Sequence, residues 1–319
     1  MIVVLGDLIA DLTLRIPSFP VQAAQLQRVE YLALGPGGAA NVAIMAARLG
    51  LPVSCLGELG TDRFGEIVLE GLKAEGIDAS GVIVGQESET PVAGVVVDRA
   101  GEPAYLGYPG KLSVRALSQD WTGRLGAAQA AFSDGWVDHD HLPALILEAM
   151  RCAARAGVPY FFDPGPGNPL FDPAWHQEAC TLARVLLATE EEALRLTRLA
   201  DPLESARVLL RRGPELIVLK RGAAGCVLLR GDEIQIAPGF PVESRDTTGA
   251  GDSLDAAVIS GYLRGLSLEE IGALANATGA AKVQKLGTGR NLPTLAEVRA
   301  VLERFGVEPS RLIPSFGPD

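Results

Sequence analysis

Short aliphatic runs alternate along this chain with longer amphipathic stretches that are rich in alanine and leucine. The strand-like runs are 2–5, 53–56, 130–133, 160–163, 185–187 and 216–219. The helical stretches between them are 40–49, 64–75, 143–156, 190–198 and 202–211. Strands that alternate with helices are typical of a mostly parallel sheet covered by helices. The alternation therefore predicts an α/β fold.

Two regions break this alternation. Residues 11–34 and 91–108 are rich in valine, leucine and tyrosine and show no helical period, which predicts antiparallel β-strands. We expect them to form a small β lid, over about 11–35 and 89–109, on a single domain that spans 1–319. Such a lid leaves an apolar face that either closure over a substrate or a second subunit must cover, so a homodimer through the lids is one hypothesis.

The C-terminal third and the overall charge add further constraints. Three helices are predicted there, over 249–264, 268–285 and 295–305. The formal net charge of −11 argues against a nucleic-acid partner, because such proteins gather lysine and arginine on one face. The apolar runs are much shorter than the roughly 20 residues that span a bilayer. We therefore expect no membrane partner and a cytoplasmic location.

The segment RDTTGAGDS, residues 245–253, carries the strongest chemical signal and precedes an apolar helical run. Small residues at Gly249, Ala250 and Gly251 let backbone N–H groups converge at a helix N-terminus, where unpaired donors and the helix dipole favour an anion. Asp252 follows on the first turn, where a carboxylate can take the proton of a hydroxyl that attacks phosphorus. The segment predicts phosphoryl transfer, although an aspartate here could also simply cap the helix.

This segment resembles the C-terminal signature of the ribokinase-like (PfkB) family of carbohydrate kinases. The stretch GPGGAANVA, residues 35–43, is similar to the N-terminal signature of that family, and shorter matches extend over nearly the whole chain. The resemblance implies a three-layer α/β/α sandwich with a mostly parallel central sheet and a small β lid. It also implies an ATP-dependent kinase that phosphorylates a hydroxyl of a sugar or sugar-like small molecule.

The resemblance assigns roles to individual residues. Asp252 matches the general base of the family, and the backbone of residues 249–251 matches the anion hole for the transferred phosphoryl group. The positions that match substrate-binding residues are Asp11, Gly37, Gly38 and Asn41. The positions that match ATP-binding residues are Lys220, Gly222, Gly225 and Asn276.

Metal sites also follow from the resemblance. Glu192 matches the acidic residue that reaches Mg²⁺ through water in the family. Thr189 stands where the family usually has asparagine, so Glu190 or Glu191 is an alternative metal contact. The other alternative is that these residues form a solvated acidic first turn of a helix and bind no metal. Asp246 and Thr248 match a site that binds a monovalent cation in some members. The implied cofactors are therefore ATP and Mg²⁺, with K⁺ as a further candidate.

The acceptor is left open by the sequence. Ile9 replaces the asparagine that is usual in ribokinases, and Gly110-Lys111 replaces a common Gly-Ala-Asn run, which disfavours a plain ribokinase. Lys111 is either an exposed lysine or a partner for an acidic substrate. A nucleoside kinase of the same family is the main alternative.

Two functions from other classes also fit parts of the sequence. Gly35, Gly37 and Ala40 precede a helix, and Glu58 lies near the end of the next strand, as in the dinucleotide fingerprint of an NAD-dependent oxidoreductase. That alternative leaves the segment DTTGAGD unexplained. A non-catalytic sugar or nucleoside sensor would keep the same binding motifs, but an intact Asp252 argues against lost catalysis.

Overall fold

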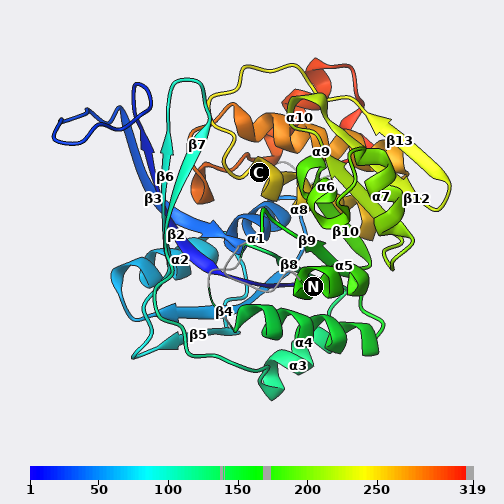
Figure 1. Ribbon diagram of the computed structural model, residues 1–319, viewed down its shortest axis with the longest axis horizontal. Coiled ribbons are helices and arrows are strands. Elements are labelled where there is room, and N and C mark those ends of the chain that lie inside the picture. Colours follow the sequence, from blue (N-terminus) through cyan, green and yellow to red (C-terminus); the bar gives the residue numbers. More distant parts are fainter. Residues whose placement is uncertain (137–138, 140, 168–173, 314–319) are drawn as a thin grey trace.

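A nine-stranded, mostly parallel sheet is the centre of the computed structural model, which describes residues 1–136, 139, 141–167 and 174–313 (Figure 1). Its strand order is β13-β12-β11-β10-β9-β8-β1-β4-β5. Neighbours from β11 to β5 pair in parallel, whereas β12 and β13 are antiparallel at one edge. The strands are β1 (Ile2–Leu5), β4 (Val53–Gly60), β5 (Val82–Gly85), β8 (Ala130–Asp134), β9 (Tyr160–Asp163), β10 (Val185–Thr189), β11 (Leu216–Lys220), β12 (Cys226–Arg230) and β13 (Glu233–Ala237).

Two hydrophobic cores lie on opposite faces of this sheet. In β1, Ile2 and Val4 belong to the first core, and Val3 and Leu5 belong to the second, because successive side chains of a strand point to opposite faces. The helices of the first core are α1 (Ala39–Arg48), α2 (Arg63–Ala74), α8 (Ala250–Leu263), α9 (Leu268–Val283) and α10 (Leu295–Arg304). Those of the second are α3 (Gln119–Gly126), α4 (Leu142–Arg155), α5 (Ala174–Leu182), α6 (Glu190–Thr197) and α7 (Pro202–Leu210). The predicted three-layer α/β/α sandwich is confirmed.

A second sheet has four strands in the order β3-β2-β6-β7 and lies beside the central sheet, at the left of Figure 1. Its strands are β2 (Leu8–Arg15), β3 (Tyr31–Gly38), β6 (Val92–Val97) and β7 (Pro103–Tyr108). The predicted antiparallel pairing is right for β2–β3 and β6–β7 but wrong for β2–β6, which pair in parallel. Several elements separate β2 from β6 along the chain, and such a long crossover allows parallel pairing.

The β prediction for 11–34 is also too long. Residues 16–30 form a loop without a strand, and this loop contains Pro17 and Pro20, which cannot donate a backbone hydrogen bond to a sheet. Among the helices of the described ranges, none is long and apolar enough to cross a membrane.

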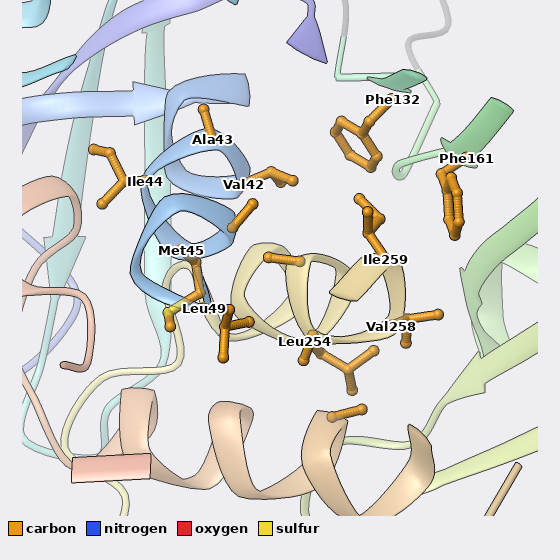
Figure 2. Close-up of a cluster of buried hydrophobic side chains, with 14 of the residues drawn as sticks. Val42, Ala43, Ile44, Met45, Leu49, Phe132, Phe161, Leu254, Val258 and Ile259 are labelled. Carbon is orange, nitrogen blue, oxygen red and sulfur yellow. The ribbon is translucent and has the colours of Figure 1, made fainter. Parts of the chain in front are cut away.

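Helices α1 and α8 pack against each other in the first core (Figure 2). Figure 2 shows Leu49, the residue that follows α1, near Leu254 of α8, with Phe132 and Phe161 of the central strands at the upper right above Ile259. Both helices start from a glycine with positive φ, at 58° for residue 38 and 76° for residue 249, which glycine adopts at little cost. The two predicted glycine-rich motifs therefore lie at the starts of two helices that contact each other.

Candidate active site

A cavity of about 970 Å³ lies at the carboxyl ends of the central strands, between the four-stranded sheet and the start of α8. In open α/β sheets this is the edge where ligands bind. The predicted site residues that line it are Asp11, Gly38, Asn41, Glu192, Lys220, Gly222, Thr248, Gly249, Ala250, Gly251, Asp252 and Asn276. Three other predicted site residues do not line the cavity: Gly37, Gly225 and Asp246.

Asp252 is held in place by segments that are far apart in the sequence. The Asn41 amide donates a hydrogen bond of 2.9 Å to Asp252 Oδ2, and Asn41 Oδ1 accepts one of 3.1 Å from the Gly289 N–H. Desolvation raises the pKa of Asp252 to about 6, although the hydrogen bond from Asn41 lowers it in part. Such a carboxylate is mostly ionised at neutral pH and still accepts a proton more readily than an exposed aspartate does.

Asp11 lies on β2, lines the cavity and is only 5% exposed. Its Oδ2 accepts a hydrogen bond of 2.6 Å from the Thr288 hydroxyl. Burial raises the pKa of Asp11 to about 7, while the hydrogen bond from Thr288 lowers it and the charge of Asp252 raises it further. A Cβ at Gly37 would lie within 2.3 Å of the Asp11 carboxyl, so any larger residue here would displace that side chain. The predicted substrate-binding residues therefore lie together.

The backbone N–H groups expected to form an anion hole differ in whether they already have a partner. The Ala250 N–H donates to the Thr247 carbonyl at 3.1 Å, so this group already has a partner within the chain. Gly251 and Asp252 lie in the first turn of α8, where N–H groups have no carbonyl partner within the helix. Lys220 Nζ lies 3.7 Å from the position that a Cβ of Gly251 would occupy, which places a positive charge beside this turn.

Lys220 has two acidic partners that the sequence analysis missed. Its Nζ donates to Asp163 Oδ2 at 2.6 Å and lies 3.3 Å from both carboxylate oxygens of Asp255. Burial lowers the pKa of Lys220, but these carboxylates outweigh the burial and raise the pKa above its ordinary value. Asp163 ends β9, and Asp255 lies one helical turn after Asp252. An acidic residue at the end of a strand, or one turn after Asp252, could have been singled out from the sequence. The sequence does not show that both residues contact Lys220.

Two of the predicted nucleotide-binding residues, Gly225 and Asn276, meet at the segment 237–239. A Cβ at Gly225 would lie 2.2 Å from the Ala237 carbonyl oxygen, so glycine is required for this close approach. The Asn276 amide donates to the Ala237 carbonyl at 2.9 Å and to the Pro238 carbonyl at 3.1 Å. Gly222, with φ 54°, begins the turn between β11 and β12. Gly225 and Asn276 therefore hold the segment 237–239 at the wall of the cavity.

Glu192 and Thr189 form a capping box at the start of α6. The Glu192 carboxylate accepts the Thr189 N–H at 2.8 Å, and the Thr189 hydroxyl accepts the Glu192 N–H at 3.1 Å. Thr189 therefore works as a helix cap in place of the usual asparagine. Burial, with the charge of Asp163, raises the pKa of Glu192. Glu190 pairs with Arg221 instead, and Glu191 is exposed, so Glu192 is the one of the three that lines the cavity.

These groups fit a hydrated Mg²⁺ ion. Mg²⁺ keeps several waters and uses one or two carboxylates together with substrate phosphates, rather than a cage made only of protein groups. The Glu192 carboxylate at the cavity wall fits this pattern. Within the ranges that the structure describes, His, Cys, Asp and Glu side chains form no cluster of three or more that could hold a metal by themselves.

Asp246 and Thr248 lie together in the loop before α8. Asp246 Oδ1 accepts the Thr248 N–H at 2.9 Å, and Asp246 Oδ2 accepts the Gly287 N–H at 2.7 Å. One carboxylate oxygen therefore holds the loop itself, and the other ties the loop to the segment after α9.

Several further cavity residues were not singled out from the sequence. Asp7 follows β1, and Asp134 is the last residue of β8. Both residues line the cavity. Tyr105 of β7 and Trp136 form an aromatic wall, with ring centroids 5.6 Å apart in an edge-to-face arrangement. Acidic residues at strand ends could have been noticed in the sequence. The aromatic pair could not, because only the folded lid brings the two residues together.

Glu58 has no role in ligand binding of the kind that the dinucleotide alternative requires. Its carboxylate accepts hydrogen bonds from the Ser88 hydroxyl, from the N–H and hydroxyl of Ser113, and from the Val114 N–H. The side chain is buried and ties β4 to the two ends of the lid segment. A ribose hydroxyl therefore has no access to it, and the oxidoreductase alternative is wrong.

Comparisons with known proteins agree with this geometry. A ribokinase from Mus musculus is 31% identical over 304 residues, which cover 92% of this chain and 91% of the relative. An ATP-dependent ribose-1-phosphate kinase from Halopiger xanaduensis is 31% identical over 300 residues, which cover 92% of this chain and 96% of the relative. The structure of Arabidopsis thaliana ribokinase complexed with ribose and ATP superimposes with a TM-score of 0.80 at 24% identity, covering 95% of this chain and 98% of that one.

The family profile described as pfkB family carbohydrate kinase matches residues 1–295. This match covers both glycine-rich motifs, the four-stranded sheet and the cavity. The chain belongs to the pfkB family of carbohydrate kinases.

Proposed function

We propose that this protein transfers the γ-phosphoryl group of ATP to a hydroxyl of an uncharged sugar or nucleoside. One observation carries the proposal: Asp252, held by Asn41, lies on the first turn of α8 beside the Lys220 ammonium group and faces the cavity. A base and an anion-binding helix start are thus adjacent. These are the two features that transfer of a phosphoryl group to a hydroxyl needs most.

In this mechanism the acceptor is held by Asp11 and Asn41 with one hydroxyl at Asp252. The hydroxyl proton passes to the Asp252 carboxylate as the oxygen attacks phosphorus, and the bond from phosphorus to the leaving oxygen breaks. The Gly251 N–H and the Lys220 ammonium group stabilise the negative charge on the phosphoryl oxygens. Because Lys220 is fixed by Asp163 and Asp255, its position needs little rearrangement during the reaction.

The nucleotide is proposed to occupy the side of the cavity near Gly222 and Asn276, with Glu192 holding Mg²⁺ through water. When bound, Mg²⁺ neutralises part of the phosphate charge. The tight backbone packing at Gly225 forms the wall behind the nucleotide. This assignment follows the position of these residues beside the β11–β12 turn and the segment 237–239, whereas Asp11 lies on β2 of the four-stranded sheet.

The charges of the cavity favour an uncharged acceptor. Four carboxyl groups line it near the acceptor position: Asp7, Asp11, Asp134 and Asp252. Lys220 is the one lysine or arginine among the lining residues of the described chain, and it pairs with two aspartates. The residues outside the described ranges contain neither lysine nor arginine. Burial raises the pKa of Asp134 well above its ordinary value, so the negative charge there comes mainly from Asp252 and in part from Asp11. A phosphate or carboxylate on the acceptor would meet this charge without a counter-charge.

Lys111 does not supply that counter-charge. It is exposed and does not line the cavity, while its backbone pairs with Glu89. The aromatic wall of Tyr105 and Trp136 instead offers a surface on which the apolar face of a sugar ring or a nucleobase can stack. Both a sugar kinase and a nucleoside kinase therefore fit the acceptor side of the cavity.

Measurement of ADP formation with matched acceptors tests the proposal. Ribose, ribose 1-phosphate, fructose, fructose 6-phosphate and a purine and a pyrimidine nucleoside would be compared at equal concentration. We expect kcat/KM for a neutral acceptor to exceed that for its phosphorylated counterpart by at least about a hundredfold. A phosphorylated acceptor as the best substrate would contradict the charge argument. Binding of neutral acceptors without any ADP formation would instead favour the sensor.

A further inference from the structure

Lys282 is a buried lysine that the proposed reaction does not use. It lies in the last turn of α9, and its side chain is 0% exposed. A lysine is almost never fully buried unless its ammonium group is paired. The surroundings of this ammonium group should therefore show what it does.

Two backbone carbonyls hold the ammonium group. Lys282 Nζ donates to the Asp246 carbonyl at 3.3 Å and to the Lys285 carbonyl at 3.2 Å. The Asp246 carboxylate, also 0% exposed, is the acidic group on this loop. Burial lowers the pKa of Lys282 below its ordinary value, although the charges of Asp246 and Asp252 oppose this shift. The lysine and Asp246 therefore balance each other's charge out of contact with water.

The position of Lys282 also connects α9 to the start of α8. The Arg245 and Asp246 N–H groups both donate to the Val283 carbonyl, at 2.7 and 3.2 Å, so this loop covers the C-terminal end of α9. Lys282 Cε lies 3.6 Å from the position that a Cβ of Gly249 would occupy. The ammonium group and the residue that begins the anion-binding turn are thus neighbours.

A cation is favoured at this place for two reasons. The carbonyl end of a helix carries partial negative charge, and the loop adds the carbonyl oxygen and the carboxylate of Asp246. A monovalent cation is expected here from the family resemblance of Asp246 and Thr248. The Asp246 carbonyl already accepts from Lys282, and an added K⁺ beside it would be repelled by the ammonium charge. The residues present therefore do not fit K⁺.

We propose that the Lys282 ammonium group is a built-in cation that orders residues 246–249, so that this kinase works without K⁺. Lys282 acts as a positioning residue, because it contacts the loop rather than a substrate. The proposal goes beyond the phosphoryl transfer proposed above, and it can be tested on the unfolding of the protein as well as on activity.

The first test compares cations on the wild-type protein. Activity and the thermal unfolding midpoint would be measured in KCl, NaCl and tetramethylammonium chloride at equal ionic strength. We expect both to be the same in the three salts. A rate or a midpoint that rises specifically with K⁺, or a Tl⁺ ion found beside Asp246 in soaked crystals, would overturn the proposal.

The second test replaces the lysine. Lys282→Ala leaves the carbonyls and Asp246 without a cation, so we expect a lower unfolding midpoint and a kcat reduced by about tenfold or more. Added K⁺, NH₄⁺ or ethylammonium should restore part of both in this variant and have no effect on the wild type. Lys285→Ala is the matched control, since Lys285 Nζ forms an ion pair with Glu297 and is partly exposed.

The outcome of the second test separates a structural lysine from a cation substitute. A folded Lys282→Ala protein that none of these cations restores would overturn the proposal. If Lys282→Ala does not fold, Lys282→Arg, which keeps the positive charge, is compared in the same three salts. The comparison of salts on the wild-type protein then decides whether K⁺ is needed. Failure of the kinase proposal would remove the activity readout but leave the unfolding midpoints as they are.

Discussion

The Asn41 amide donates a hydrogen bond of 2.9 Å to the Asp252 carboxylate, although 211 residues separate the two. Asn41 lies on the first turn of α1 and Asp252 on the first turn of α8, so the packing of these helices sets the distance between their starts. The hydrogen bond joins a residue expected to hold the acceptor to the residue expected to take its proton. The two roles are therefore coupled through one contact.

Replacement of Asp252 by asparagine should abolish most of the activity. The amide keeps the shape of the side chain but cannot accept the hydroxyl proton, so we expect kcat to fall by about 10²–10⁴-fold. Binding of ATP and acceptor, measured by calorimetry, should stay close to that of the wild type. A variant that keeps more than half of the wild-type kcat would show that Asp252 is not the base.

The pH dependence should report the ionisation of Asp252. Because the pKa of this carboxyl is raised to about 6, activity should be lost as the pH falls through that value and the base becomes protonated. Asn41 stabilises the charged form, so Asn41→Ala should raise the pKa and move the acid limb of kcat/KM to higher pH. An acid limb that does not move would mean that the hydrogen bond has no influence on the base.

Loss of Asp11 should affect both acceptor binding and turnover. Asp11 lies on β2 at the root of the four-stranded sheet and is proposed to hold the acceptor. Closure of this sheet over the acceptor would exclude water from Asp252, so Asp11→Ala should raise KM strongly and also lower kcat. Steady-state kinetics with the identified acceptor provide the measurement. An unchanged KM would remove Asp11 from the acceptor site.

A homodimer through the four-stranded sheets is expected from the exposed apolar side chains on one face. Leu32 is 64% exposed and Leu106 is 68% exposed, and the strand register places them on the same face. A second copy would cover this face. Light scattering should show a dimer at micromolar concentration that Leu106→Asp breaks. Ile236→Asp, at a 62% exposed position on β13, is the control, and a monomeric wild type would exclude the dimer.

The fold could be predicted where the sequence has a strong local period. The strands of the central parallel part and the helices of the C-terminal third agree with their predicted ranges within a few residues, apart from longer β4 and β10. The elements β5, β12, β13, α3 and α5 were not predicted. They are short, and β13 has mostly exposed side chains, so hydrophobic periodicity identifies them poorly.

The sequence by itself determined the family, the layered α/β fold and the positions of both glycine-rich motifs, because these depend on local patterns of residues. Only the tertiary structure decided which groups meet. It pairs Lys220 with Asp163 and Asp255, uses the Ala250 N–H inside the chain, and buries Lys282 against the loop before α8. The physical reason is that each of these contacts joins separate segments, and their geometry depends on how helices and strands pack rather than on any residue pattern along the chain.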